Sequence, residues 1–185
     1  CGDADGAVTG NTRRYGASLE KIKRVVDPRP EEIMFGLNMI VSKGKTVFVG
    51  DTSVHEYPSS EQLADIAISA SRVVRLFGFD PKVAFVSHST FGQPLTSRTK
   101  HIKNAVNILK ERNVDFMFDG DMQPDVALNE QYKELYPFSN IVGNANILIM
   151  PGQHSAAISY KMMRELGGAK VIGPLLVGLA QPMEI

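Results

Sequence analysis

The sequence has no tryptophan, a single cysteine and no surplus of charge of either sign. Because Cys1 has no second cysteine to pair with, a disulfide within the chain is excluded, and a reducing cytoplasm is the expected environment. The 20 Lys and Arg residues balance the 20 Asp and Glu residues, which does not favour a nucleic-acid-binding protein. No apolar run approaches the ~18 residues of a membrane span, and no secretory signal pattern is present. The composition therefore predicts a cytoplasmic protein with no nucleic-acid or membrane partner.

Motifs that would identify a nucleotide or metal site are also missing. The chain contains neither a GxGxxG motif nor a P-loop, so nucleotide-driven hydride or phosphoryl transfer has no support. The four histidines lack the spacing of metal ligands and are more typical of surface or packed residues. Asp119, Asp121 and Asp125 gather three carboxylates at the end of a predicted strand, a pattern compatible with a metal ion and equally with a solvated capping turn. We assign no metal site from the sequence.

The hydrophobic pattern of the 185 residues, 43% of which are apolar, indicates an α/β protein. Unbroken apolar runs at 82–86 and 147–150 indicate strands that are covered on both faces. Residues 59–77 place their apolar side chains on one helical face, and Ser59 with Gln62 is expected to form a capping box. Further strands are expected at 7–8, 32–41, 46–49, 114–118 and 171–179, and further helices around 19–26, 102–109 and 155–166.

The predicted elements alternate between strand and helix along the whole chain. Pro124 is expected to open one more helix, and Gly167-Gly168 to end the last one. This alternation predicts one three-layer α/β/α domain over residues 1–185, with a mostly parallel sheet and right-handed crossovers. Because the chain begins without Met and is already strand-like, we expect it to be a piece of a longer polypeptide.

In such a sheet, ligands bind where strands end and helices begin. Polar stretches at 87–92, 119–125 and 151–155 occupy these points. In the first, the hydroxyl groups of Ser89 and Thr90 and the backbone amides near Gly92 could donate hydrogen bonds to a phosphate or carboxylate. The stretch lacks the Gly-x-Ser-x-Gly pattern of a hydrolase nucleophile. Two interpretations stay open: an anion-binding cradle, or polar side chains that only cap a turn.

Six motifs follow one another along nearly the whole chain: Asp3-Ala-Asp5-Gly6, Asp51-Thr52 with Pro58-Ser-Ser-Glu61-Gln-Leu-Ala64, Ser87-His-Ser-Thr-Phe-Gly92, Asp119-Gly-Asp-Met122, Asn144-Ala-Asn-Ile147 and Gly173-Pro-Leu-Leu-Val-Gly-Leu-Ala-Gln-Pro182. In this order and register they resemble the phosphate acetyltransferase family. Within the family, the first and third motifs are most similar to the acetyltransferase-like domain fused behind bacterial NADP-dependent malic enzymes. The resemblance implies an isocitrate/isopropylmalate dehydrogenase-like fold.

The resemblance also implies an acetyl-CoA pocket beside residues 87–92, in a cleft shared with a second subdomain. The ligand-binding residues that we expect from it are Ser87, Ser89, Thr90, Gly92, Arg13, Arg14, Asn144 and Pro174.

Two departures from the family pattern bear on catalysis. Active members carry Asn-Asp-Leu-Ser-Arg after the last Gly-Pro strand, whereas Glu184-Ile185 stands where Asn-Asp would begin. Active members also carry an arginine in the first helix, and Glu20 takes its place here, with Arg13 and Arg14 nearby as substitutes. Transfer of an acetyl group between CoA and phosphate needs a base for the thiol and cations for the phosphoryl oxygens. The resemblance with these departures implies a domain without catalytic residues.

We therefore expect an acetyl-CoA-binding regulatory and oligomerisation domain of a fused malic enzyme. The parent would convert malate to pyruvate with NADP and Mg²⁺ or Mn²⁺, on a catalytic domain in the same chain and outside these residues. Homo-oligomer contacts, including those of a dimer, are expected through this domain. Two alternatives stay open: an active phosphate acetyltransferase, and a purely structural oligomerisation domain.

Overall fold

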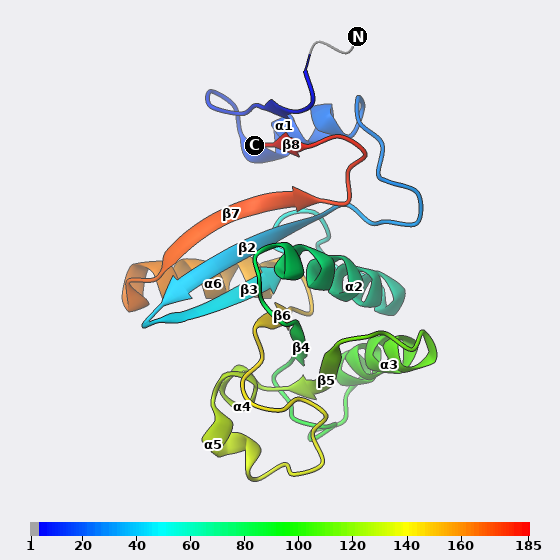
Figure 1. Ribbon diagram of the computed structural model, residues 1–185, viewed down its shortest axis with the longest axis vertical. Coiled ribbons are helices and arrows are strands. Elements are labelled where there is room, and N and C mark those ends of the chain that lie inside the picture. Colours follow the sequence, from blue (N-terminus) through cyan, green and yellow to red (C-terminus); the bar gives the residue numbers. More distant parts are fainter. Residues whose placement is uncertain (1–3) are drawn as a thin grey trace.

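The computed structural model describes residues 4–185, so the expectations for Cys1 and Asp3 fall outside the described residues. A six-stranded sheet in the order β5-β4-β6-β3-β2-β7 forms the centre of the molecule (Figure 1). The strands are β2 (Phe35–Ser42), β3 (Lys45–Gly50), β4 (Lys82–Val86), β5 (Met117–Met122), β6 (Ile147–Ile149) and β7 (Lys170–Val177). β5, β4, β6 and β3 run parallel, whereas β2 is antiparallel to both of its neighbours.

Helices cover both faces of this sheet. The longer helices are α2 (Ser60–Leu76), α3 (Ser97–Glu111) and α6 (Gln153–Gly167), and the short ones are α4 (Pro124–Leu128) and α5 (Glu130–Lys133). Successive strand residues point to opposite faces. Phe48 accordingly joins the core cluster that contains α2 and α3, whereas its neighbour Val49 joins the cluster that contains α4 and α6. In Figure 1, α6 lies behind β2 and β3. The expected three-layer arrangement with a mostly parallel sheet is confirmed.

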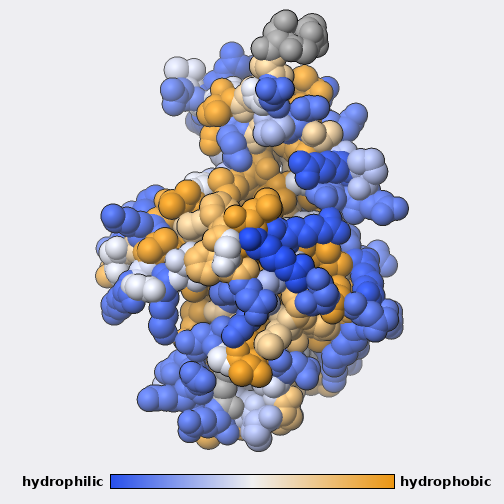
Figure 2. All heavy atoms as spheres, in the orientation of Figure 1, coloured by the Kyte–Doolittle hydropathy of each residue, from blue (hydrophilic) through white to orange (hydrophobic). Residues whose placement is uncertain are grey.

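A smaller unit lies beside the sheet, at the top of Figure 1 and Figure 2, and contains the first and last strands described. β1 (Ala7–Val8) pairs in parallel with β8 (Met183–Glu184), and α1 (Tyr15–Ile22) packs with them. Its small core includes Leu19 and Ile22 together with Leu176 of β7. The two units are therefore joined by β7 and by the segment 23–34, which precedes β2.

Several local signals in the sequence are confirmed. Ser59 and Gln62 form the expected capping box of α2, and Pro124 is the first residue of α4. Gly168 adopts a left-handed conformation, with φ of 62°, and ends α6. That conformation costs glycine little because it has no Cβ.

The strand expected at 114–118 is displaced along the chain. The structure places β5 at Met117–Met122, and Val114 and Phe116 pack against the core from outside the strand. The acidic residues Asp119 and Asp121 lie within the strand because backbone and hydroxyl donors hydrogen bond to their carboxylates. The strand expected at 32–41 likewise begins later: it is β2 of the six-stranded sheet, which starts at Phe35. None of the described helices is long and apolar enough to cross a bilayer.

Candidate functional site

The carboxyl ends of four parallel strands meet at one edge of the sheet, and three neighbouring cavities lie there. Their volumes are about 390, 290 and 150 Å³. All three are lined by Arg98 from the first turn of α3 and by Pro151 from the loop after β6. Clefts at this edge are the usual ligand sites of open α/β sheets. These three cavities form the candidate site.

The loops after β3, β4 and β6 supply the walls of the candidate site. Tyr57 and Pro58, from the loop before α2, line the largest of the three cavities. Ser87 and His88, directly after β4, line the middle one together with Ser155 from the first turn of α6. The site is therefore built from segments that are far apart in the sequence and meet only because the strands are parallel.

The turn after β4 is organised around a carboxylate from the neighbouring strand. The Ser89 hydroxyl and the Gly92 backbone N–H both donate to the side chain of Asp121, the latter over 2.9 Å. Thr90 accepts a hydrogen bond from the backbone N–H of Gln123, over 3.3 Å. Ser89 and Asp121 are both fully buried. Three of the expected cradle residues, Ser89, Thr90 and Gly92, therefore already form hydrogen bonds within the protein, as the capping interpretation expects. That they contact a ligand stays a prediction.

The other expected ligand residues occupy different parts of the molecule. Ser87 lines the candidate site. Arg13 and Arg14 are exposed, at the start of α1 in the smaller unit, and neither lines the three cavities. Asn144 precedes β6 and so lies at the opposite edge of the sheet, and Pro174 lies in the edge strand β7. The structure brings only Ser87 of these residues into the cavities, and the binding roles of the others stay predictions.

Arg98 is the central residue that sequence reasoning missed. The side chain is exposed and makes no ion pair within the part of the chain that the structure describes, residues 4–185. α3 begins with a capping box between Thr96 and Thr99, which satisfies backbone N–H groups in the first turn of the helix, next to Arg98. The signal that could have identified Arg98 is its position, a permanent cation in the first turn of a helix that follows a polar strand-end turn.

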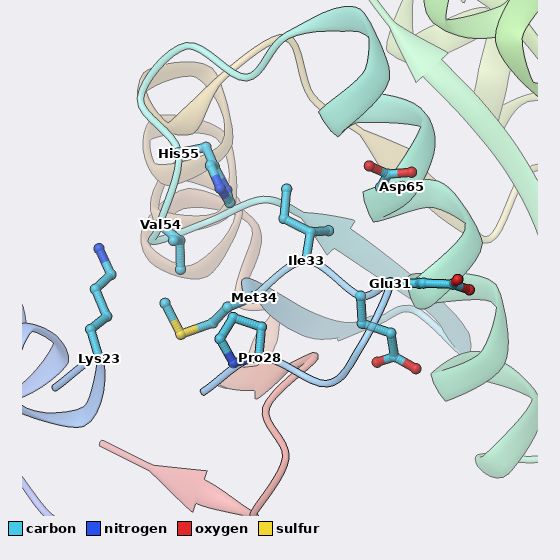
Figure 3. Close-up of a pocket in the computed structure, with 9 residues that line it drawn as sticks. Lys23, Pro28, Glu31, Ile33, Met34, Val54, His55 and Asp65 are labelled. Carbon is cyan, nitrogen blue, oxygen red and sulfur yellow. The ribbon is translucent and has the colours of Figure 1, made fainter. Parts of the chain in front are cut away.

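A larger cavity of about 610 Å³ lies elsewhere, between the segment 28–34 and the loop after β3 (Figure 3). His55 is directed toward this cavity, and its Nδ1 lies 2.8 Å from the buried carboxylate of Asp51. Two of the acidic side chains on its wall are already paired, Glu32 with Arg72 and Asp65 with Arg112. None of the expected ligand residues lines it. It is therefore not part of the candidate site.

Two ionisable groups at the junction with the smaller unit have shifted pKa values. Burial raises the pKa of Tyr15, whose hydroxyl donates to Ser53 over 2.9 Å. Burial also raises the pKa of the Glu184 carboxyl, partly offset by the backbone N–H of Leu176. Because the folded state binds this proton more tightly, Glu184 favours folding at acidic pH, and that contribution is lost as the pH rises through the raised pKa.

Among residues 4–185, no group of three or more His, Cys, Asp or Glu side chains is placed to hold a metal ion. The Asp119 carboxylate accepts backbone N–H groups from Gly120, over 2.9 Å, and from Asn140, over 2.7 Å. It therefore contributes to the local fold of the loop that precedes β6.

Comparison with known proteins places these features in a family context. The profile of the family described as phosphate acetyl/butaryl transferase matches residues 1–185. An NADP-dependent malic enzyme of Rhizobium meliloti (strain 1021) is 50% identical over 184 residues, which are 100% of this chain and 24% of that protein. A phosphate acetyltransferase of Clostridium acetobutylicum is 34% identical over 192 residues, covering 98% of this chain and 57% of that protein.

Among solved structures, a phosphotransacetylase from Streptococcus pyogenes superposes with a TM-score of 0.90 at 28% identity, covering 97% of this chain and 56% of that one. The chain thus spans about a quarter of the malic enzyme (24%) and about half of the phosphotransacetylase (56%).

Proposed function

Because this chain belongs to the phosphate acetyl/butaryl transferase family, we propose that it is the acetyl-CoA-binding regulatory domain of an NADP-dependent malic enzyme. The similarity to the Rhizobium meliloti malic enzyme, 50% over the whole of this chain, supports this assignment. The malate-oxidising chemistry, with its NADP and divalent metal, would be carried by a catalytic domain outside these residues. This domain itself would not transfer acetyl groups.

The observation that carries the proposal is the position of Arg98 at the junction of three cavities. Acetyl-CoA is an elongated molecule with phosphate groups at one end and an uncharged chain at the other. The guanidinium of Arg98 and the backbone N–H groups at the start of α3 suit the phosphates. Pro58, Pro151 and Ile102 supply apolar walls for the uncharged chain.

The proposed lack of acetyl transfer rests on the distribution of charge. Of the described residues that line the three cavities, Arg98 is the one permanent cation. Glu20, in α1 of the smaller unit, takes the place of the arginine that active members of the family carry in the first helix. A carboxyl group there opposes the binding and stabilisation of a phosphoryl group.

Regulation would follow from linkage between binding and quaternary arrangement. If acetyl-CoA binds one arrangement of the malic enzyme more tightly than another, it shifts the population toward that arrangement. The change in malate turnover then reflects the activity of the favoured arrangement.

The test is an acetyl-CoA titration and an acetyl-transfer assay, run side by side on the full-length protein. We expect saturable binding, altered malate turnover and no transfer. Arg98→Gln should weaken acetyl-CoA binding at least about tenfold, because hydrogen bonds to charged groups are among the strong ones. Lys100→Gln removes a positive charge from another exposed position of the same helix, and it should leave acetyl-CoA binding unchanged. Transfer at ordinary enzymatic rates would instead establish an active transferase, and absence of binding would leave a structural role.

We also propose that a second copy of the chain covers the outer face of α6. Only Ala156 of this 15-residue helix is buried. Ile158, Met162 and Leu166, each four residues apart, are 58%, 54% and 82% exposed. Such an exposed apolar stripe suits a self-complementary contact.

Met162→Glu should therefore shift the full-length protein to a smaller assembly, measured by light scattering on a size-exclusion column. A charge at the centre of a buried apolar contact has no compensating partner. Leu76→Glu is the matched control, since Leu76 is 87% exposed and lies on α2. An unchanged assembly in the Met162 variant would contradict this contact.

A further inference from the structure

A fourth cavity, of about 240 Å³, lies between α3 and the edge strand β5. It shares no lining residue with the candidate site. Its walls come from one face of α3, from the end of β5, from Phe91 in the turn after β4, and from Phe138 and Asn140 in the loop before β6. The volume is below the roughly 300 Å³ at which pockets for drug-sized molecules begin, so a ligand here would be a small metabolite.

One wall of this cavity carries two positive charges. Lys103, Asn107 and Lys110 follow each other at intervals of four and three residues, which places them on one face of α3. All three side chains are exposed. Within residues 4–185, the side chain of neither lysine forms an ion pair or a hydrogen bond. Their ammonium groups are therefore available to a ligand.

The facing wall carries two negative charges. Asp119 and Asp121 are both buried and line the same cavity. Each oxygen of the two carboxylates accepts one hydrogen bond from a nearby backbone N–H or from the Ser89 hydroxyl. A carboxylate oxygen has a second lone pair, so both groups can still accept a hydrogen bond from a ligand.

The balance of charge decides which class of ligand fits. A purely anionic ligand that contacts the lysines would face two buried carboxylates, and a purely cationic one would face two ammonium groups. A zwitterion has a partner for each of its charges. The rings of Phe91 and Phe138, with centroids 4.8 Å apart, add an apolar surface beside these charged groups. An α-amino acid with an apolar side chain combines all three features at a suitable size.

We propose that this cavity is a second ligand site, which binds a zwitterionic α-amino acid with an apolar side chain. Lys103 and Lys110 bind its carboxylate, Asp119 and Asp121 accept from its ammonium group, and the phenylalanine rings contact its side chain. The site is separate from the acetyl-CoA site proposed above and does not depend on it.

The probes are L-leucine and L-phenylalanine, each titrated into the full-length protein by calorimetry. L-Leucinamide lacks the carboxylate and 4-methylpentanoate lacks the ammonium group, with the same branched carbon chain. We expect saturable binding of at least one amino acid, and at least about tenfold weaker binding of both analogues, since each loses charge-assisted hydrogen bonds. Equal binding of either analogue would overturn the proposal. Failure of both amino acids to saturate by about 10 mM, an affinity weaker than about −3 kcal/mol, would also overturn it.

Substitutions then locate the bound amino acid. Lys103→Gln and Lys110→Gln should each weaken binding about tenfold, because each removes one charged donor. Lys100→Gln makes the same change on an exposed position of α3 outside this cavity, and it should leave binding unchanged. Undiminished binding in both variants, or an equal loss in the control, would show that the amino acid binds elsewhere. Either result would refute the site.

Discussion

Asp51→Ala is expected to lower the free energy of unfolding of this domain by about 3–5 kcal/mol, a typical cost of removing one partner from a buried charged network. The Asp51 carboxylate is 1% exposed and accepts backbone N–H groups from Gly36, Ser53, Val54 and His55 over 2.7–3.1 Å. It also lies 2.8 Å from Nδ1 of His55. Alanine would leave these donors without an acceptor in a place that water reaches poorly.

The measurement is the urea midpoint of the transition in which this domain unfolds, in the full-length protein. Asp51→Asn keeps one acceptor oxygen and should lose less. Asp80→Ala is the control, because the Asp80 side chain is exposed and makes no hydrogen bond within residues 4–185. If the Asp51 and Asp80 variants unfolded at the same urea concentration, the carboxylate would not organise the loop that carries Tyr57 and Pro58 into the candidate site.

Gly178→Ala is expected to destabilise the domain by about 3 kcal/mol or more, which corresponds to a fall in melting temperature of about 6–12 °C. Gly178 follows β7 with φ of 87°, a conformation that disfavours other residues. A Cβ there would lie 2.7 Å from the carbonyl carbon of Ile33 and still closer to its oxygen. Because these are backbone atoms, the segment that joins the two units would have to move.

Gly167→Ala provides the comparison. Gly167 lies at the end of α6, and a Cβ there would meet no heavy atom within 4 Å. Alanine is the better helix former, so this variant should melt at the same temperature or slightly higher. The measurement is the melting temperature of this domain in the two full-length variants. Equal melting temperatures would mean that the backbone at Ile33 yields without cost.

Local signals predicted much of the fold because they act over a few residues. The capping box at Ser59 and Gln62, the proline that opens α4 and the glycine that ends α6 all satisfy or release backbone groups within one turn. The strand β4 was predicted with its bounds, since a buried parallel strand needs an unbroken apolar run. β5 was displaced because its acidic residues are stabilised by partners that the local pattern does not reveal.

The candidate site divides in the same way. That ligands should meet the turn after β4 follows from the alternation of strands and helices, and Ser87 does line the site. That Arg98 faces all three cavities depends on how α3 packs beside the loop after β6, which no local pattern encodes. Sequence reasoning left Asp121 open between a metal ligand and a solvated capping turn. The structure places it in β5, where its carboxylate accepts hydrogen bonds from Ser89 and Gly92 of the turn after β4.

The sequence by itself determined the class of fold, the family and the type and order of most elements, because hydrophobic periodicity and caps are properties of neighbouring residues. Boundaries were less well determined: the helix expected around 19–26 spans Tyr15–Ile22. Only the tertiary structure decided which donors remain open to a ligand. Ser89 and Asp121 are 32 residues apart in the chain and meet because β4 and β5 are adjacent. Such pairing follows from the order of strands in the sheet. Packing between distant segments therefore decides which groups of the turn after β4 can still contact a ligand.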